Sequence, residues 1–301
     1  MAGPNYATAP LKAITREMLV EVTRRLVRYG PLRDMTYVGL GALEFVDFRL
    51  VYERLGIENL VSIEGSHPLG RLEFNRPYDS IRILQGTTNI RLPEIEELKS
   101  SRCVVWLDYT SRLRQSEHRD LAYLASVLAP GSALFVCVNR NAPEKEFEEI
   151  RQEFGDYFDE NLRKVSYVGP GLADQQRIVA DRIIRKHIAT RESPPAIERV
   201  LDVRYADSGK MQLLGWIFGP QGSDIAADCR LGELDFTATA RADQSLELAW
   251  PSLTAPEWDA LTHQLPASID TIQPPHKFIE RSHVERFLAV HRWGRPSAAN
   301  A

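Results

Sequence analysis

The sequence predicts an α/β fold in which a mostly parallel, doubly wound sheet is followed by a small C-terminal accessory module. At residues 37–48 a short apolar run ends in two glycines and leads into a helical pattern, as at the start of nucleotide-binding α/β units. The fully apolar run 103–107 fits a central parallel strand that is covered on both faces. Two alternating runs, 200–205 and 211–218, flank Asp-Ser-Gly, which indicates an antiparallel hairpin.

Composition bounds the protein class and the domain count. The 301 residues carry a net charge of −4, with acids and bases interspersed, so no strong basic field points to nucleic acid, although nucleic acid is not excluded. We see no signal peptide and no apolar stretch long enough to span a bilayer, which predicts a cytoplasmic protein without a membrane partner. We divide the chain into an N-terminal helical segment (1–33), the main α/β domain (34–220) and an accessory α+β module (221–301).

The cysteines are few and far apart. Cys103, Cys137 and Cys229 lie mostly in apolar runs, and we interpret them as buried thiols in a reducing compartment. Their spacing does not indicate a metal site.

The first predicted element is an amphipathic helix from Leu11 to Tyr29, which Gly30-Pro31 ends. Its polar face is basic. We interpret this face as solvated charge, and the alternative is a wall for an anionic substrate. The basic residues are Lys12, Arg16, Arg24, Arg25 and Arg28.

Strands and helices then alternate along the main domain. Apolar runs bounded by turn residues predict five parallel strands, and the hairpin raises the count to seven. The strands are Thr36–Leu40, Asn59–Glu64, Ser80–Leu84, Cys103–Leu107 and Ser132–Val138. We predict helices from about Glu44 to Leu55, from Arg71 to the break at Pro77, over Asp120–Ala129 and over Leu172–Ile188. A further helix begins after Asn141, which we expect to be its N-cap.

The tail changes character after about Pro220. We predict short strands at 231–240 and 246–249, a helix that a capping box opens at Thr254 and that reaches about Leu265, and a last helix from Ser282 to Arg292.

The glycine turn carries the first functional signal. Gly39 permits a tight turn, and Gly41 lets the backbone approach a ligand, but Glu44 occupies the third glycine position of the dinucleotide fingerprint. A pyrophosphate would meet Glu44 and Asp47 at a cost on the order of 4 kcal/mol. S-Adenosylmethionine, with its ammonium and sulfonium, avoids this cost. Alternatively, both acids only occupy a first helical turn, where carboxylates are favoured.

The ends of the other strands supply further candidates. Glu64 ends the second strand about 25 residues past the glycines, where an acid accepts hydrogen bonds from ribose hydroxyls. Gln85 and Gly86 follow the third strand and are placed to contact an adenine. Asp108 and Tyr109 end the fourth strand, and we expect them to face the reaction crevice. The alternatives are an exposed strand-end Glu64 and a surface turn at Asp108.

With these residues in place, the chain resembles a bacterial family of O-methyltransferases. The similarity looks continuous over residues 5–140, includes the hairpin at 200–218 and is loose in the tail. One departure is Ala9, where the family pattern has an arginine before the proline. The similar residues are Asn5-Tyr6, Pro10, Lys12, 37–41, Phe45, Asp47-Phe48, 62–64, Arg71, Phe74-Asn75, Pro77 and 106–109.

The resemblance implies a Rossmann-like sheet of the class I methyltransferase type and S-adenosylmethionine-dependent methyl transfer to an unidentified oxygen or nitrogen acceptor. We predict that Gly39, Gly41 and Ala42 surround the methionine portion and that Glu64 holds the ribose. Asp108 would accept the acceptor's proton or orient it, and Tyr109 would stack on the acceptor or close the pocket.

Two other functions stay open. Base methylation ranks below a small-molecule or protein acceptor, because 108–110 lacks the prolines of the amino-methyltransferase motif. The fold could also serve as an inert interaction subunit, with Trp258 and Trp293 as exposed aromatic contacts, although we expect both to pack on the main domain.

Overall fold

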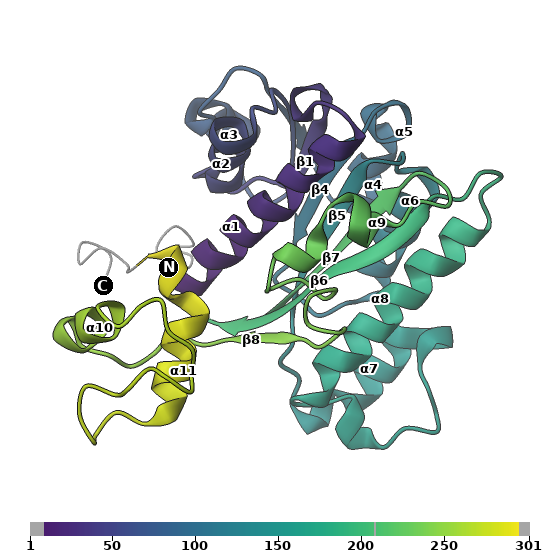
Figure 1. Ribbon diagram of the computed structural model, residues 1–301. Helices are drawn as coiled ribbons and strands as arrows, with labels where there is room; N and C mark the ends of the chain where they lie inside the picture. The colour runs from purple at the N-terminus through teal and green to yellow at the C-terminus, as the bar shows by residue number, and fades with distance from the viewer. Residues whose placement is uncertain (1–8, 208, 295–301) are drawn as a thin grey trace.

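The computed structural model describes residues 9–207 and 209–294. Asn5, Tyr6 and Ser208, which the sequence comparison and the hairpin prediction include, lie outside these residues. One sheet runs through the molecule, and helices cover both of its faces (Figure 1).

The sheet has eight strands in the order β3-β2-β1-β4-β5-β7-β6-β8. Strands β1 to β5 are parallel, whereas β7 is antiparallel to both β5 and β6. This arrangement confirms the predicted fold class. The prediction of seven strands missed the eighth as a member of the sheet, because β8 pairs with β6 in parallel over only three residues. The strands are β1 (Thr36–Leu40), β2 (Asn59–Glu64), β3 (Ile81–Gln85), β4 (Cys103–Asp108), β5 (Ser132–Asn139), β6 (Ala196–Ala206), β7 (Lys210–Gly219) and β8 (Leu246–Leu248).

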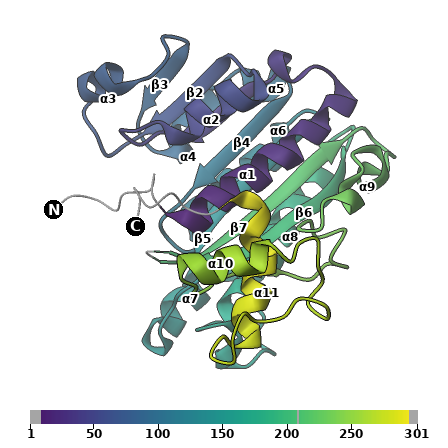
Figure 2. The same cartoon turned by 60° about the vertical axis from the view of Figure 1, so that its left-hand side comes forward.

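The helices form two layers. Buried residues of α1, α2, α10 and α11 share one apolar cluster with one face of the sheet, and Figure 2 shows α1, α10 and α11 on this side. Residues of α6, α7 and α8 pack on the opposite face. The helices are α1 (Pro10–Arg25), α2 (Val46–Leu55), α3 (Leu69–Asn75), α4 (Thr88–Arg91), α5 (Glu97–Ser100), α6 (Gln115–Val127), α7 (Phe147–Phe154), α8 (Gly171–Ala189), α9 (Ile225–Asp228), α10 (Ala255–Thr262) and α11 (Arg281–Val290).

Alternation along the central strands sorts side chains between these layers. In β4, Val104 and Trp106 pack with α1 and α2, whereas Val105 and Leu107 pack against the opposite helices. This is the two-residue period of a strand whose two faces are both buried. It explains why the run 103–107 is apolar throughout.

Two local predictions were wrong, and one helix start differs slightly from its prediction. The stretch 231–240 is a 3-10 turn (Leu231–Glu233) followed by turns, because the Thr237 hydroxyl donates to the carbonyls of Leu231 and Leu234 and so closes the chain on itself. Asn141 caps no helix, and α7 begins at Phe147. Helix α2 begins at Val46, two residues after the predicted start at Glu44.

The tail packs on the sheet, as predicted for its tryptophans. Trp258 is buried, stacks on Trp250 with ring centroids 5.4 Å apart, and meets the edge of Phe287. Trp293 is partly buried against the same cluster and contacts Phe236. These contacts disfavour the use of either tryptophan as a free interaction surface.

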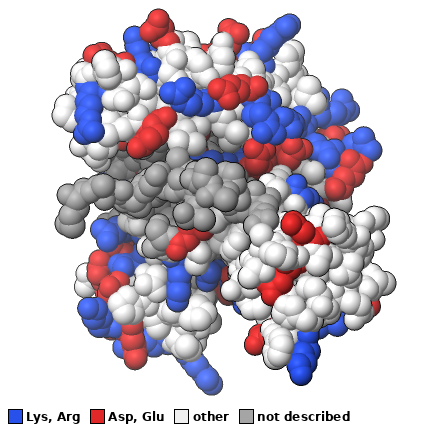
Figure 3. Space-filling model, turned by 90° about the vertical axis from the view of Figure 1, so that its left-hand side faces the viewer, with Lys and Arg blue, Asp and Glu red and all other residues white. Residues whose placement is uncertain are grey.

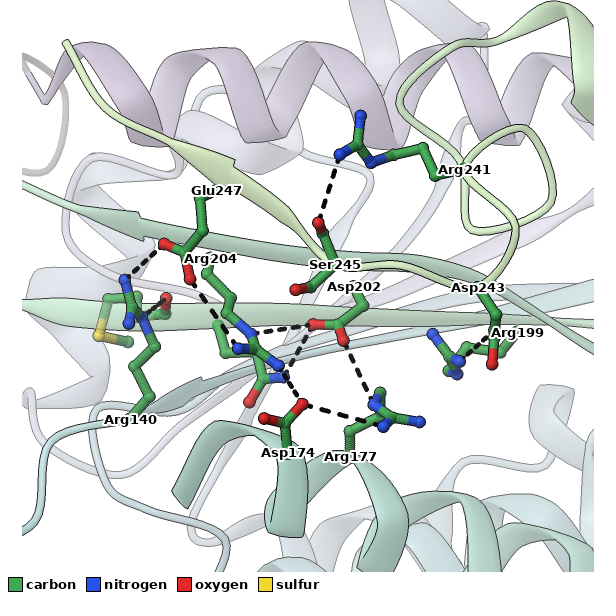
Figure 4. A network of polar contacts seen from close by, with 12 residues as sticks. Arg140, Asp174, Arg177, Arg199, Asp202, Arg204, Arg241, Asp243, Ser245 and Glu247 are labelled. Atoms are coloured by element: carbon green, nitrogen blue, oxygen red, sulfur yellow. Dashed lines mark hydrogen bonds and ion pairs between the residues drawn. The ribbon is translucent and has the colours of Figure 1, made fainter. Parts of the chain in front are cut away.

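A network of ion pairs joins β8 and α8 to β6 (Figure 4). Arg204 of β6 lies 2.5 Å from Asp174 of α8 and 3.9 Å from Glu247 of β8. Asp202, almost fully buried, accepts from Gln212 and pairs with Arg177. Burial raises the pKa of Asp202, and the Gln212 amide and the three nearby arginines oppose this rise.

Of the helices that the structure describes, none combines the length and the apolar character needed to cross a bilayer. Cys103, Cys137 and Cys229 are unpaired and buried, as predicted. On the face shown in Figure 3, blue and red side chains are intermingled over the visible surface.

Candidate functional site

A cavity of about 620 Å³ opens where β1, β2 and β4 end. Its size falls within the range of about 300–1,000 Å³ found for small-molecule and cofactor sites. The carboxyl edge of an open parallel sheet is where such folds bind ligands. The lining includes Gly41, Ala42 and Glu44 after β1, Glu64–His67 after β2, Gly86–Asn89 after β3, and Asp108–Ser111 after β4.

Gly41 packs closely against β2, and its backbone N–H donates to the Ile63 carbonyl oxygen at 3.3 Å. A Cβ at this position would lie 2.1 Å from the Ser62 hydroxyl oxygen, so only glycine fits without a shift. That hydroxyl is buried and has no hydrogen-bond partner among the described residues.

Gly39 differs from its predicted role. It lies inside β1 and is not among the residues that line the cavity. A Cβ there would lie 2.6 Å from the Tyr37 hydroxyl oxygen. Gly39 therefore makes room for a buried tyrosine in the layer beneath the loop and does not form the turn, because the strand continues to Leu40.

The Glu64 carboxylate lines the cavity and is already oriented. Its Oε1 accepts the Ser66 backbone N–H at 2.5 Å, and among the described residues Oε2 has no hydrogen-bond donor. Gly86 also lines the cavity. Gln85 does not: it is exposed, and its side-chain amide donates to the carbonyl oxygen of His67 at 3.1 Å. The contact of Gln85 with an adenine stays a prediction, and its side chain points toward the loop after β2.

Two buried ion pairs come from the basic face of α1. Lys12 Nζ lies 2.5 Å from Asp108 Oδ1, and Arg16 Nε lies 2.5 Å from Asp47 Oδ1. Lys12 and Arg16 are only 5% and 6% exposed, so the prediction of solvated charge is wrong for these two residues. The reason is that α1 crosses the sheet directly over the end of β4.

These pairs hold the cations in their charged forms. Burial lowers the pKa of Lys12, but Asp108, Cys137 and Asp47 together raise it above its ordinary value. Burial likewise lowers the pKa of Arg16, but Asp47 outweighs burial and raises this pKa above its ordinary value. Burial raises the pKa of Cys137 to about 12, against the lowering by Lys12, so the thiol stays protonated and is a poor nucleophile.

Tyr109 is fixed by a buried carboxylate. Its hydroxyl donates to Asp120 Oδ2 at 2.6 Å, and Thr88 and Asn89 donate to the same carboxylate. Asp120 is 1% exposed. Burial raises its pKa, and the three hydrogen bonds oppose this rise. Asp120 thus joins α6 to two segments of the cavity wall.

A second cavity of about 160 Å³ lies beside the first. The two share Asp108, Tyr109 and Thr110. The smaller cavity is otherwise lined by the start of α1, the end of β5 and the tip of the β6–β7 hairpin, through Ala9, Lys12, Asn139, Tyr205, Asp207, Gly209 and Met211.

The structure brings most of the predicted site together. Gly41, Ala42, Glu64, Gly86, Asp108 and Tyr109 all line the larger cavity. The sequence analysis missed Ser66, His67, Thr87–Asn89 and Asp120. A Gly-Thr-Thr-Asn sequence after a strand could have indicated a loop that leads into a short helix, whereas nothing near Asp120 in the sequence signals its partners.

The charge around the larger cavity is negative. Of the described residues that line it, Glu44, Asp47, Glu64, Asp108 and Glu117 are acidic, and Arg16 is the one arginine or lysine. Asp47 and Asp108 are neutralised by ion pairs, which leaves Glu44, Glu64 and Glu117. This wall disfavours a pyrophosphate and favours a cationic ligand.

Comparison with solved structures finds methyltransferases. A putative S-adenosylmethionine-dependent methyltransferase from Listeria monocytogenes is 11% identical, with a TM-score of 0.43 over 66% of this chain and 98% of that chain. An O-methyltransferase family protein from Burkholderia thailandensis is 12% identical, with a TM-score of 0.37, and the match covers 69% of this chain and 57% of that one. Likeness at this level does not bear on substrate or partner.

Comparison of sequences identifies the family. No curated protein matches the chain. The family model described as "Putative O-methyltransferase" matches residues 4–294, which is nearly the whole chain and includes the tail. The chain therefore belongs to this O-methyltransferase family.

Proposed function

We propose that the chain binds S-adenosylmethionine in the larger cavity and transfers the methyl group to an oxygen or nitrogen acceptor, with a small molecule or a protein favoured. The observation that carries this proposal is the meeting of Gly41, Glu64 and Asp108 around one cavity with an excess of carboxylates. Family membership supports the reaction type.

The lining residues fit this cofactor. Gly41, Ala42 and Gly86 offer backbone without side-chain bulk, and the free Oε2 of Glu64 is suited to accept from the ribose hydroxyls. Gln85 and Gly39 would act indirectly, by holding His67 and by accommodating Tyr37.

Bound S-adenosylmethionine would supply an electrophilic methyl group on a sulfonium. The protein then has to align the acceptor and exclude water. Asp108 faces both cavities and carries the charge that can orient the acceptor or take its proton. Tyr109 is held by Asp120 and lines both cavities, so it provides a rigid wall between cofactor and acceptor.

Isothermal titration with S-adenosylhomocysteine tests the proposal. We expect the wild type to bind and Glu64→Gln to bind at least about tenfold more weakly, because a charged hydrogen-bond acceptor is lost. Glu58→Gln is the matched control, since Glu58 is exposed and lies just before the same strand.

Absence of binding by the wild type would overturn the proposal and leave an inert interaction subunit as the better description. Binding that is unchanged in Glu64→Gln would remove Glu64 from the cofactor site. A circular dichroism melt of each variant separates loss of binding from loss of fold.

A further inference from the structure

The smaller cavity contains a buried ammonium with unused hydrogen-bonding capacity. Lys12 donates to Asp108 at 2.5 Å and lies 5.4 Å from the centroid of the Trp106 ring. An ammonium has three N–H donors, and among the described residues Asp108 is its only hydrogen-bond partner. Lys12 is 5% exposed, so water has little access to the remaining donors.

The backbone around Lys12 fixes this arrangement. Ala9, at the start of α1, has no side chain that could accept a hydrogen bond. Asp207, from the tip of the β6–β7 hairpin, provides the missing capping group for α1. Its carboxylate accepts hydrogen bonds from the backbone N–H groups of Leu11 and Lys12 at 3.3 and 2.9 Å. Both Asp207 oxygens are thereby used, and the Lys12 side chain is held over the end of β4.

The size and walls of the cavity limit what fits. About 160 Å³ is close to the volume of an apolar cavity that holds one benzene ring. Tyr109, Tyr205 and Met211 provide flat or adaptable apolar walls. The Tyr205 hydroxyl lies 3.2 Å from Cys137 Sγ, so its polar end is already engaged.

We infer that the smaller cavity is the acceptor site and that it binds a single-ring phenol, whose hydroxyl accepts from Lys12 and donates to Asp108. The inference rests on the proposed function and narrows its acceptor from oxygen or nitrogen to oxygen. A neutral aromatic amine could donate to Asp108, but it is a poor acceptor for Lys12. A protonated amine would meet the ammonium as a like charge.

The same pair of residues suits transfer to oxygen. The hydroxyl proton passes to the Asp108 carboxylate, and the ammonium of Lys12 stabilises the negative charge that develops on the oxygen. An oxygen lone pair forms the new O–CH₃ bond as the C–S bond of the S-adenosylmethionine donor breaks. The electron pair of that bond stays on sulfur, which becomes the thioether of S-adenosylhomocysteine, so charge and atoms balance.

Ligand-observed NMR with the full chain, saturated with S-adenosylhomocysteine, tests the inference. The probes are phenol, aniline and benzene. We expect phenol to bind at least about tenfold more tightly than either of the others, because only phenol pairs with both charged groups. Equal binding of benzene and phenol, or tighter binding of aniline, would overturn the inference.

Lys12→Met locates the site, with Lys145→Met as the matched control because Lys145 is exposed. We expect Lys12→Met to lose the preference for phenol over benzene and to keep S-adenosylhomocysteine binding, since Lys12 does not line the larger cavity. An unchanged preference in Lys12→Met would place the phenol elsewhere. If Lys12→Met does not fold, the binding of phenol, aniline and benzene to the wild type still tests whether the protein prefers phenol.

The two proposals fail in different ways. If S-adenosylhomocysteine does not bind to the wild type, the proposed function is wrong. If it binds but phenol shows no preference, only the acceptor inference is wrong.

Discussion

The contact between the glycine loop and the sheet depends on the absence of a side chain at Gly41. The Ser62 hydroxyl occupies the space into which a Gly41 side chain would point, and it has no partner of its own among the described residues. A buried hydroxyl without a partner costs free energy.

We predict that Gly41→Ala destabilises the fold by about 1–3 kcal/mol, because its Cβ would overlap Ser62 Oγ. Ser62→Ala alone should leave the free energy of unfolding unchanged or slightly higher, since it removes an unsatisfied group. The double variant should recover part of the loss. Urea denaturation of the three variants measures the coupling, and additive effects would show that the two positions do not compete for space.

Arg16 and Lys12 show how burial changes the contribution of a charged side chain to stability. Both belong to a basic helix face, yet each is buried against a carboxylate at the cavity. Their chain neighbours Arg24 and Arg25 pair with Glu21 and Glu233 nearer the surface. Breaking a buried pair costs about 3–5 kcal/mol, against about 0–1 kcal/mol for a surface pair.

At the scale of elements, α1 is positioned by the hairpin. Asp207 caps its first turn from a segment almost 200 residues away in sequence. The ion pairs of Figure 4 attach α8 and β8 to the same two-stranded unit. The tip of the hairpin thus lines the smaller cavity, and residues 203–205 of β6, just before the tip, pair with β8 of the tail.

The contact between α6 and α7 is predicted to weaken in acid. His118 of α6 packs against Phe154 and Tyr157, with ring centroids 6.1 and 5.9 Å away. Burial lowers the pKa of His118 from 6.5 to about 4, although Glu117 opposes this change. The unfolded chain therefore binds more protons between these two values, so stability rises with pH across this window and is lost as the pH falls through it.

The maximum contribution is about 3 kcal/mol, and partial solvation of the ring reduces it. We expect His118→Gln to flatten the loss of stability between pH 6.5 and 4, measured by urea denaturation at fixed pH. His263→Gln is the control, because His263 is exposed. Parallel curves for the wild type and His118→Gln would contradict the prediction.

At the scale of the whole molecule, the tail completes the core. Leu231, Phe236, Trp258, Leu261 and Phe287 are buried in the cluster that also contains α1, α2 and one face of the sheet. The division at about residue 220 stays a prediction. We propose that residue 220 marks a change in the arrangement of helices and strands and that the segments on its two sides do not fold independently.

A chain that ends at Pro220 should therefore fail to fold cooperatively. Each of these five apolar side chains contributes about 1.5–3 kcal/mol, so that together they contribute about 8–15 kcal/mol, which is comparable to the whole stability of about 5–15 kcal/mol typical of a folded protein. A chain that ends at Gly294 is the control. Thermal unfolding and solubility compare the two, and a cooperative transition in the shorter chain would show that the tail is dispensable.

The sequence by itself determined the order of the strands along the chain, the glycine loop and the acids at the strand ends. These are local signals, because an apolar run with a glycine or an acid at its end indicates a strand that ends at a turn or a site, whatever packs around it. That is why Gly41, Glu64, Asp108 and Tyr109 could be named from the sequence and why they line one cavity.

Only the tertiary structure decided which charges are buried and which strands pair. Lys12 and Arg24 are both basic residues outside the apolar stripe of α1, and only the packing of α1 on the sheet buries Lys12 against Asp108 and leaves Arg24 near the surface. Asp120 and Asp207 act through partners from distant elements, and the predicted strand at 246–249 joins the sheet as β8 because β6 offers a free edge. Such contacts depend on how elements meet in space, and no local pattern of residues encodes them.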